Sequence, residues 1–291
     1  MPKSAVSRSS RLVTVLLSAL GIVAATATAP ALAAGSPAHS VGSSGGNYLA
    51  LGDSVPFGYH NVTDLAVYAN PHNLVGYPEL LAKETHRRLT NASCPGETSG
   101  SFIDPTSDVY KCEGPAGYRT NFPLHVNYPG SQLAFAVHYL RTTHDVRLVT
   151  LQIGANDVFL CQSATADQCT SPAEQQAVLA RVHENIERIV TTLRHQGHYH
   201  GRLVVVDYYA LDYADPTAVQ GAEALDRAID TAAADRGAAV ASGFRAFAAI
   251  ALARGAGDSR AAGLVRPAPD VHPTPFGQDL LEDAVQAVVG R

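Results

Sequence analysis

The chain of 291 residues contains no tryptophan, a single methionine and few charged side chains, which make up 16% of the sequence. The lack of tryptophan argues against a protein that stacks sugar rings on an aromatic platform, although the 12 tyrosines offer a substitute. The formal net charge is −5. Because nucleic-acid binding requires a basic face, this charge argues against a nucleic-acid partner.

Metal-binding patterns are also missing. The sequence has neither an H-E-x-x-H nor a C-x2-C spacing, which are common in zinc sites. His195, His198 and His200 form a cluster, but they follow a predicted helix in a stretch that favours a solvated turn over a metal site. We therefore expect neither a metal ion nor an organic cofactor, and we disfavour a secreted metalloenzyme.

The first 33 residues have the organisation of a secretory signal peptide. A region with three basic side chains precedes the apolar run of residues 12–25, and Ala31-Leu32-Ala33 supplies an A-x-A cleavage site. The run is short and ends in a cleavage motif, so we favour a signal peptide over an N-terminal membrane helix. Cleavage near Ala33 predicts a secreted, extracellular protein.

The remaining 258 residues (291 minus 33) are few enough for a single domain. Residues 34–46 are rich in serine, glycine and alanine and predict a flexible leader. Residues 47–291 are predicted to form the domain. This part has no second apolar run of membrane-spanning length, so we expect no integral membrane association. We expect the protein to be a monomer.

Four cysteines lie in the predicted domain: Cys94, Cys112, Cys161 and Cys169. An even number in an exported chain predicts two disulfides, for which three pairings are possible. We favour the local pairing of Cys94 with Cys112 and of Cys161 with Cys169. Each of these pairs brackets a loop-like segment rich in glycine, serine, threonine and aspartate.

Strand-like and helix-like segments alternate along the domain. Short apolar runs predict strands buried on both faces of a parallel sheet, whereas apolar residues at helical spacing predict covering helices. The alternation predicts an α/β fold, a three-layer α/β/α sandwich with a central parallel sheet. The predicted strands are Tyr48–Leu51, Leu148–Ile153, Leu203–Val206 and Ala238–Ala241; the predicted helices are Tyr77–Leu89, Ser131–Arg141, Ala173–Arg194, Ala218–Arg236 and Phe276–Val289. Residues 90–130 interrupt the pattern and predict a disulfide-tied insertion at the mouth of the sheet.

Polar clusters follow two of the predicted strands at the point where each strand ends. Gly52-Asp53-Ser54 follows the first strand, and Gly154-Ala155-Asn156-Asp157 follows the second. The carboxyl ends of parallel strands form the ligand crevice of such a sheet, so both clusters are expected to face it. Ser54 could be a nucleophile there, or the tripeptide could be an ordinary turn.

A nucleophilic serine needs a base, and histidine suits this role because its pKa lies close to neutral pH. His272 is the best placed of the 12 histidines. It stands in a loop before the last predicted helix, next to an acid and followed by a proline, in Pro269-Asp270-Val271-His272-Pro273. These neighbours are suited to holding an imidazole ring in place.

Four segments of the chain together resemble the four sequence blocks of the SGNH (GDSL) hydrolase superfamily. They are Gly52-Asp53-Ser54, Cys94-Pro95-Gly96-Glu97-Thr98, Gly154-Ala155-Asn156-Asp157 and Asp270-Val271-His272-Pro273. They occur in the order of that family and span nearly the whole predicted domain. The cysteine-containing second block and the fragment SQLAFAVHYL resemble its secreted actinobacterial branch. The resemblance implies an SGNH hydrolase domain with a flavodoxin-like fold.

The resemblance also implies a role for each matching residue. Ser54 would attack an acyl carbonyl, and His272 would accept its proton and pass it to the leaving alcohol. The backbone N–H groups of Ser54 and Gly96 and the side-chain amide of Asn156 would hold the oxyanion. Asp53 and Asp157 are interpreted as structural, with side chains bonded to nearby backbone.

The chain departs from the family pattern at the acid of the triad. The family usually has this acid three residues before the histidine, where this chain has Pro269, and Asp270 lies only two residues before His272. Either the Asp270 carboxylate or the Pro269 carbonyl could orient the ring and fix its tautomer. We favour Asp270.

These patterns predict a secreted serine esterase or lipase that hydrolyses carboxylic esters of small molecules or lipids through an acyl-enzyme. A carbohydrate O-deacetylase and a phospholipase are alternatives with the same mechanism. A non-catalytic binding module on this scaffold is a further alternative, because fold alone does not determine function. Several apolar side chains in residues 55–75 could line an acyl site or simply pack: Val55, Phe57, Tyr59, Val62, Leu65, Val67 and Tyr68.

Overall fold

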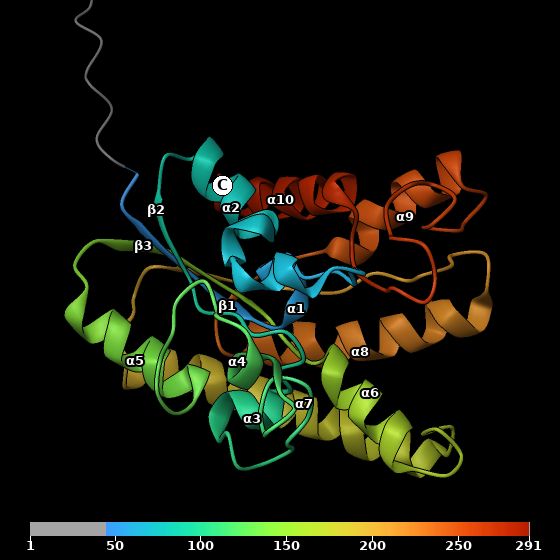
Figure 1. The fold of residues 1–291 in the computed structure, drawn as a ribbon, viewed down its shortest axis with the longest axis horizontal. Coiled ribbons are helices and arrows are strands. Elements are labelled where there is room, and N and C mark those ends of the chain that lie inside the picture. Colours follow the sequence, from blue (N-terminus) through green and yellow to red (C-terminus); the bar gives the residue numbers. More distant parts are fainter. Residues whose placement is uncertain (1–44, 291) are drawn as a thin grey trace, which may run out of the picture. The chain divides into compact units, whose positions relative to one another are not determined.

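Five parallel strands form the central sheet of the computed structural model, which describes residues 45–290. The strand order is β2-β1-β3-β4-β5 (Figure 1). The strands are β1 (Asn47–Gly52), β2 (Arg88–Asn91), β3 (Val146–Gln152), β4 (Arg202–Val206) and β5 (Ala239–Ala241). The predicted signal peptide, residues 1–33, and most of the predicted leader lie outside the described residues.

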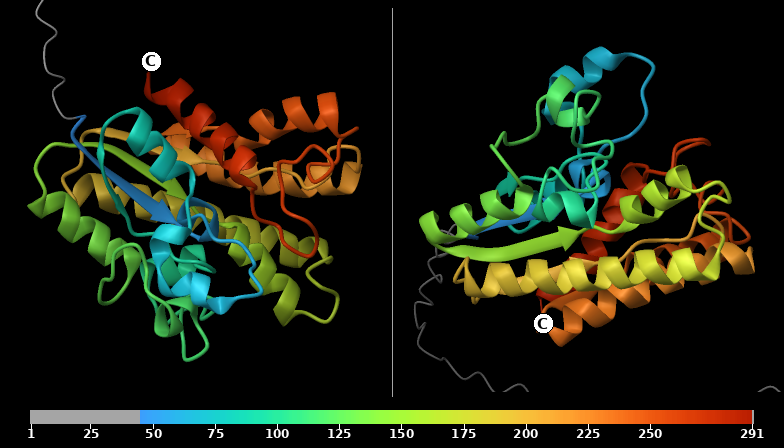
Figure 2. Two further views of the ribbon diagram at one scale, coloured as in Figure 1. Left: turned by 45° about the horizontal axis from the view of Figure 1, so that its top comes forward. Right: turned by 90° about the horizontal axis from the view of Figure 1, so that it is seen from below.

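Helices cover both faces of the sheet, as the α/β sandwich prediction requires (Figures 1 and 2). Helices α2, α9 and α10 pack together on one side, and α5, α7 and α8 lie on the other. The α-helices are α1 (Ser54–Phe57), α2 (Tyr77–Glu84), α3 (Ser99–Ile103), α4 (Tyr118–Asn121), α5 (Gln132–Thr142), α6 (Ala155–Ala164), α7 (Pro172–His195), α8 (Pro216–Asp235), α9 (Gly243–Arg254) and α10 (Pro275–Val289); the 3₁₀ helices are η1 (Leu65–Ala69) and η2 (Pro71–Asn73).

The strand order creates a switch point between β1 and β3. The chain leaves β1 toward β2 on one side and later returns to β3 on the other. In open parallel sheets, ligands bind at the carboxyl ends of strands beside such a point. Both polar clusters predicted from the sequence follow these two strands, since Ser54 follows β1 and Asn156 follows β3.

The core lies between the sheet and its helices. Tyr48, Leu51, Leu151 and Val205 are fully buried, which explains why the strands consist of nearly uninterrupted apolar residues. At the end of β1, Gly52 approaches β3 so closely that a Cβ would lie 2.0 Å from the carbonyl oxygen of Gln152. Its φ of +136° also favours glycine, so this position fixes the approach of the two strands.

The four predicted strands are confirmed, but the edge strand β2 was not predicted. The predicted helix Tyr77–Leu89 ends at Glu84 instead, and the chain turns at His86, where φ is +51°. Strand β2 is four residues long and begins with the exposed Arg88, so it lacks the apolar run that marks a buried strand. The predicted insertion contains the end of β2 and two short helices, α3 and α4.

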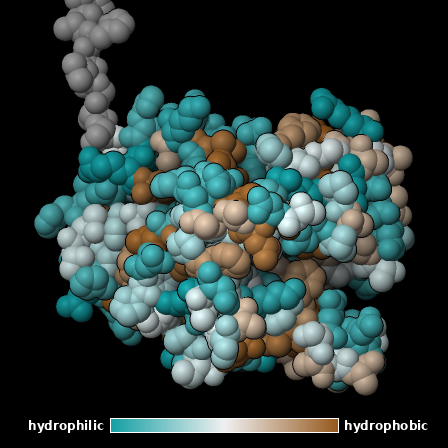
Figure 3. Space-filling view, viewed as in Figure 1, coloured by the Kyte–Doolittle hydropathy of each residue, from teal (hydrophilic) through white to brown (hydrophobic). Residues whose placement is uncertain are grey.

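The surface of the described residues carries both apolar and polar side chains. Six large apolar side chains are exposed in residues 45–290: Leu65, Val75, Val109, Phe159, Leu252 and Phe276. On the face shown in Figure 3, hydrophobic residues lie in small patches among hydrophilic ones. Within the described residues, no helix is both long and apolar enough to cross a membrane.

Candidate active site

Ser54 is the first residue of helix α1 and is separated from the end of β1 by Asp53 alone. Asp53 caps this helix, since its Oδ1 accepts the backbone N–H of Val55 at 3.0 Å. The backbone N–H of Asp53 donates to the carbonyl oxygen of Gln152 at the end of β3, at 3.1 Å. These bonds hold Ser54, with 9% of its surface exposed, at the carboxyl edge of the sheet.

Ser54, His272 and Asp270 form one hydrogen-bonded series. Ser54 Oγ lies 2.9 Å from His272 Nε2, and His272 Nδ1 lies 2.5 Å from Asp270 Oδ1. His272 comes from the loop before α10, 218 residues further along the chain than Ser54. The arrangement has the geometry of a nucleophile, a base and an acid that orients the base.

The Asp270 carboxylate is the partner of the His272 ring. Its Oδ1 also accepts the backbone N–H of His272 at 3.1 Å, and its Oδ2 accepts the backbone N–H of Asn61 at 2.9 Å. Burial raises the pKa of Asp270, but the bonds from His272 and Asn61 outweigh it and lower this pKa to about 2. Of the two alternatives left by the sequence, the structure favours the carboxylate over the Pro269 carbonyl.

Two side chains from elsewhere hold the loop that carries this pair. The guanidinium group of Arg260 donates to the backbone carbonyl oxygens of Arg266 and Asp270. The hydroxyl group of Tyr209 donates to the carbonyl oxygen of Val271 at 2.9 Å. Hydrogen bonds therefore restrain the backbone before Asp270, at Asp270 itself and at Val271.

The three expected oxyanion donors lie close to one another. Asn156 Nδ2 donates to the carbonyl oxygen of Glu97, which follows Gly96, at 2.9 Å. It also lies 3.4 Å from the carboxylate of Asp53, which precedes Ser54. Within the described part of the chain, the backbone N–H groups of Ser54 and Gly96 donate to no other protein atom. Both N–H groups are thus available to a ligand.

Gly96 adopts a backbone conformation that favours glycine. Its φ is +83°, and a Cβ at this position would lie 2.3 Å from the Cβ of Lys111. The disulfide between Cys94 and Cys112 joins the two segments at this contact. The second disulfide joins Cys161 and Cys169, so the structure has the local pairing favoured from the sequence. Loops of this length stabilise a fold by about 3 kcal/mol each in the chain-entropy model.

Asp157 has the structural role expected from the sequence, whereas Asp53 does more. Asp157 accepts the backbone N–H of Ser99 at 2.8 Å and its hydroxyl group at 2.6 Å. Asp53 Oδ2 instead accepts the hydroxyl group of Tyr208 and contacts the Asn156 amide. Burial raises the pKa of Asp53 to about 7, against the lowering effect of the Tyr208 bond.

Gln132 and Tyr208 support the site but were not predicted. Gln132 is fully buried and bonds both backbone groups of Gly52, accepting its N–H at 2.6 Å and donating to its carbonyl oxygen at 3.0 Å. Gln132 lies in the fragment SQLAFAVHYL, whose polar start before an apolar helix was the available signal. Tyr208 lies just after β4 and had no comparable signal.

Glu97 is a fully buried carboxyl group beside Gly96. Its Oε1 accepts the Ser101 hydroxyl group at 2.5 Å, and its Oε2 accepts from Gln132 at 3.3 Å. Burial raises the pKa of Glu97 to about 8, whereas glutamate in an unfolded chain has a pKa of about 4.3. Between these two values the folded state binds more protons than the unfolded state, so the free energy of unfolding falls as pH rises.

We expect the Glu97→Gln variant to weaken this pH dependence. Glutamine resembles the protonated form of Glu97 and does not titrate. As the pH is raised from about 5 to about 8, the thermal unfolding midpoint of the wild type should decrease, and that of the variant should decrease less. Thermal melts followed by circular dichroism measure both slopes. Equal slopes would show that Glu97 is not protonated in the folded state.

The apolar side chains of segment 55–75 have different surroundings: some are buried in the core, and one lies against the His272 ring. Phe57 is fully buried and Tyr68 is 4% exposed, so both belong to the core. Tyr59 lies edge-on to the His272 ring, with 5.0 Å between the ring centroids, and stacks on Tyr68 at 5.1 Å. Leu65 is 59% exposed. Of the apolar side chains considered in this segment, Tyr59 is therefore the one whose ring packs against His272.

Two groups of side chains in the described residues are close enough together to hold a metal ion. One consists of Cys94, Glu97 and Cys112, but its two sulfur atoms are joined in the disulfide. The other consists of His183, Glu187 and Asp235 on helices α7 and α8. Neither group includes a residue of the triad or of the histidine cluster at 195–200.

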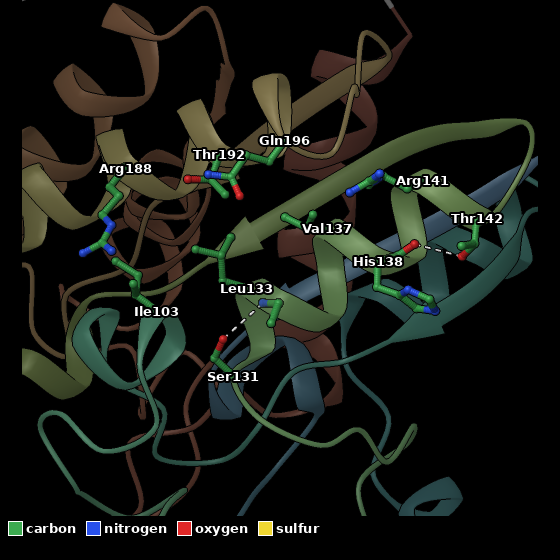
Figure 4. A pocket seen from close by; sticks show the side chains of 11 residues that line it. Ile103, Ser131, Leu133, Val137, His138, Arg141, Thr142, Arg188, Thr192 and Gln196 are labelled. Atoms are coloured by element: carbon green, nitrogen blue, oxygen red, sulfur yellow. Dashed lines mark hydrogen bonds between the residues drawn. The ribbon is translucent and has the colours of Figure 1, made fainter.

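A groove of about 730 Å³ lies between α5 and α7, away from the triad (Figure 4). Its lining includes the charged side chains Arg141 and Arg188 and the apolar side chains Leu133 and Val137. None of the predicted catalytic or oxyanion residues lines it.

Comparison with known families and structures identifies relatives of the chain. A family model described as the GDSL-like Lipase/Acylhydrolase family matches residues 50–280. No curated protein sequence matches the chain.

Solved structures share the fold at low sequence identity. Phospholipase A1 from Streptomyces albidoflavus NA297 is 19% identical with a TM-score of 0.56, over 84% of this chain and 99% of that one. The acetylxylan esterase Axe2 from Geobacillus stearothermophilus is 15% identical with a TM-score of 0.53, over 85% of this chain and 95% of that one. A putative GDSL-like lipase from Parabacteroides merdae is 11% identical with a TM-score of 0.53, over 84% of this chain and 96% of that one.

Proposed function

Because the chain belongs to the GDSL-like lipase/acylhydrolase family, a family of ester hydrolases, we propose that it hydrolyses carboxylic esters through an acyl-enzyme on Ser54. One observation carries the proposal: the hydrogen-bonded series from Ser54 Oγ through the His272 ring to the Asp270 carboxylate. A serine hydroxyl group alone is a weak nucleophile, and an adjacent oriented base makes it an effective one.

In the first half of the proposed reaction, Ser54 Oγ attacks the ester carbonyl carbon while His272 Nε2 accepts the hydroxyl proton. The tetrahedral intermediate collapses as His272 gives this proton to the leaving alcohol. In the second half, a water molecule loses its proton to His272 and attacks the acyl-enzyme; His272 then gives this proton to Ser54 Oγ as the acid is released. Asp270 keeps the proton of the neutral ring on Nδ1, so that Nε2 faces Ser54 as a base.

The oxyanion of both intermediates would be held by three N–H donors, from the backbone of Ser54, the backbone of Gly96 and the amide of Asn156. The backbone N–H groups of Ser54 and Gly96 have no acceptor within the described residues, as expected of donors that bind the oxyanion of a substrate. The positive φ of Gly96 supports this role because it sets the orientation of its peptide group, and the lack of room for a Cβ beside Lys111 favours glycine there.

We also propose that the protein is secreted and belongs to the secreted actinobacterial branch of this family. The signal peptide predicted from the sequence supports secretion. The two disulfides support it independently, because disulfides persist mainly in oxidising compartments. The branch is supported by the cysteine-containing block around Gly96 and by Gln132 of the fragment SQLAFAVHYL, which bonds β1 at the site.

The proposal can be tested with a series of p-nitrophenyl esters from acetate to palmitate and a fluorophosphonate probe. We expect the purified protein to hydrolyse members of the series in the presence of EDTA. The probe should inactivate it with one adduct per chain, found by mass spectrometry on the peptide that contains Ser54. The chain-length optimum would then distinguish a deacetylase from a lipase.

Two results would contradict the proposal. Activity that EDTA abolishes would indicate metal-dependent hydrolysis instead. Inactivation by the probe with the adduct on another serine would place the nucleophile elsewhere.

A further inference from the structure

Tyr208 makes an unexpected contact with the site. It lies just after β4, with 6% of its surface exposed, and its backbone N–H donates to Asp226 Oδ1 at 2.9 Å. Its hydroxyl group donates to Asp53 Oδ2, across 155 residues of sequence. The proposed mechanism assigns no role to this buried hydroxyl group.

Asp53 Oδ2 is also the atom that Asn156 contacts. The Asn156 amide has two N–H bonds. One of them donates to the carbonyl oxygen of Glu97 at 2.9 Å, a normal hydrogen-bond distance. Among residues 45–290, the other contacts only Asp53 Oδ2, at 3.4 Å, which is long for a hydrogen bond. This second N–H is the one that the oxyanion would need.

Asp53 and the oxyanion therefore compete for one N–H of Asn156. An ionised carboxylate is a stronger acceptor than a neutral carbonyl group, and it is stronger still in a buried site. Asp53 is 1% exposed, so water does not saturate its oxygens. Its Oδ1 is occupied by the N–H of Val55, and its Oδ2 by the hydroxyl group of Tyr208.

We infer that Tyr208 is a positioning residue for the oxyanion donor Asn156. Its hydroxyl group donates to Asp53 Oδ2 and so weakens the attraction of that oxygen for the second Asn156 N–H, which can then turn to the oxyanion. Without this hydroxyl group, Asp53 Oδ2 would draw the Asn156 amide toward itself. The inference rests on the proposed function, because it concerns the same oxyanion.

A double-mutant cycle between Tyr208→Phe and Asn156→Ala tests this coupling. Measurements at about pH 9 favour an ionised Asp53 carboxylate, because its pKa is about 7 with the Tyr208 bond in place and loss of that bond raises it. We expect Tyr208→Phe to lower kcat for a p-nitrophenyl ester by roughly tenfold, with KM changed less than twofold. Asn156→Ala should lower kcat by about 10²–10³-fold, as removal of one oxyanion donor does. In the Asn156→Ala background, Tyr208→Phe should then have little further effect.

Tyr199→Phe is the matched control. Tyr199 is 5% exposed and its hydroxyl group donates to the backbone carbonyl oxygen of Arg202 at 2.7 Å, at the start of β4 and thus at the opposite end of the strand. We expect this variant to keep the wild-type kcat. Melting curves of all variants show whether each is folded at the assay temperature. If Tyr208→Phe is not, the same cycle is measured at a temperature below its melting midpoint, where the variant is folded.

Several outcomes would overturn the inference. If the effects of Tyr208→Phe and Asn156→Ala on kcat multiply, Tyr208 acts independently of Asn156. If Tyr208→Phe keeps the wild-type kcat while Asn156→Ala loses activity, the inference fails and the proposed function stands. If the wild type hydrolyses no ester, the proposed function fails, and the inference fails with it.

Discussion

The Ser54→Ala variant is expected to lower kcat for ester hydrolysis by about 10⁵–10⁶-fold, which corresponds to about 7–8 kcal/mol in the activation barrier. Alanine removes the only atom that forms the acyl-enzyme in the proposed mechanism. The base His272 and the oxyanion donors would remain, so a small residual rate over the uncatalysed reaction should persist. The measurement is kcat on p-nitrophenyl acetate, together with loss of labelling by the fluorophosphonate probe.

Ser163→Ala is a suitable control for this variant. Ser163 is exposed on α6, and its hydroxyl group donates to the carbonyl oxygen of Leu160 at 2.9 Å, its one bond within the part of the chain that the structure describes. This control should retain full activity and labelling. Hydrolysis by Ser54→Ala at more than about one hundredth of the wild-type rate, in a protein with an unchanged melting curve, would exclude Ser54 as the nucleophile.

The sheet was predictable from the sequence where burial is complete. The runs at Tyr48–Leu51, Leu148–Ile153 and Leu203–Val206 lie on strands covered on both faces, so nearly every residue in them is apolar. Strand β2 has covered and uncovered positions and lies at the sheet edge, where the sequence need not be apolar. Helix α9 (Gly243–Arg254) was missed because its apolar residues, mostly alanine, show no clear helical face.

The site was predictable where one short segment supplies a residue together with its local support. Ser54 and Asn156 each follow a buried strand, and His272 lies in a loop before a helix, which are local signals. Gln132 and Tyr208 reach their partners over 80 and 155 residues. Such contacts depend on how the strands are ordered, and no local spacing encodes them. The orientation of the His272 ring also depends on such a contact, because Asn61 holds the Asp270 carboxylate across 209 residues.

The second large effect is expected for Asp270→Asn, which should lower kcat by about 10⁴-fold while the protein stays folded. The Asp270 carboxylate accepts from three donors: His272 Nδ1, the backbone N–H of His272 and the backbone N–H of Asn61. Asparagine has one acceptor oxygen and one NH₂ group in their place. In one orientation its NH₂ group meets the N–H of Asn61; in the other it meets Nδ1 and favours the ring tautomer with its proton on Nε2. That tautomer cannot accept the Ser54 proton.

The measurement is kcat for Asp270→Asn beside Asp258→Asn as a matched control. Asp258 also accepts two backbone N–H groups, those of Arg260 and Ala261, but does not contact His272. The control should stay within about threefold of the wild-type kcat. Because the pKa of Asp270 is about 2, its carboxylate is ionised throughout the working range, and the deficit of Asp270→Asn should appear at every pH above about 4. A loss smaller than tenfold would instead support a Ser54–His272 dyad whose ring is oriented by the backbone, as the Pro269 carbonyl alternative requires.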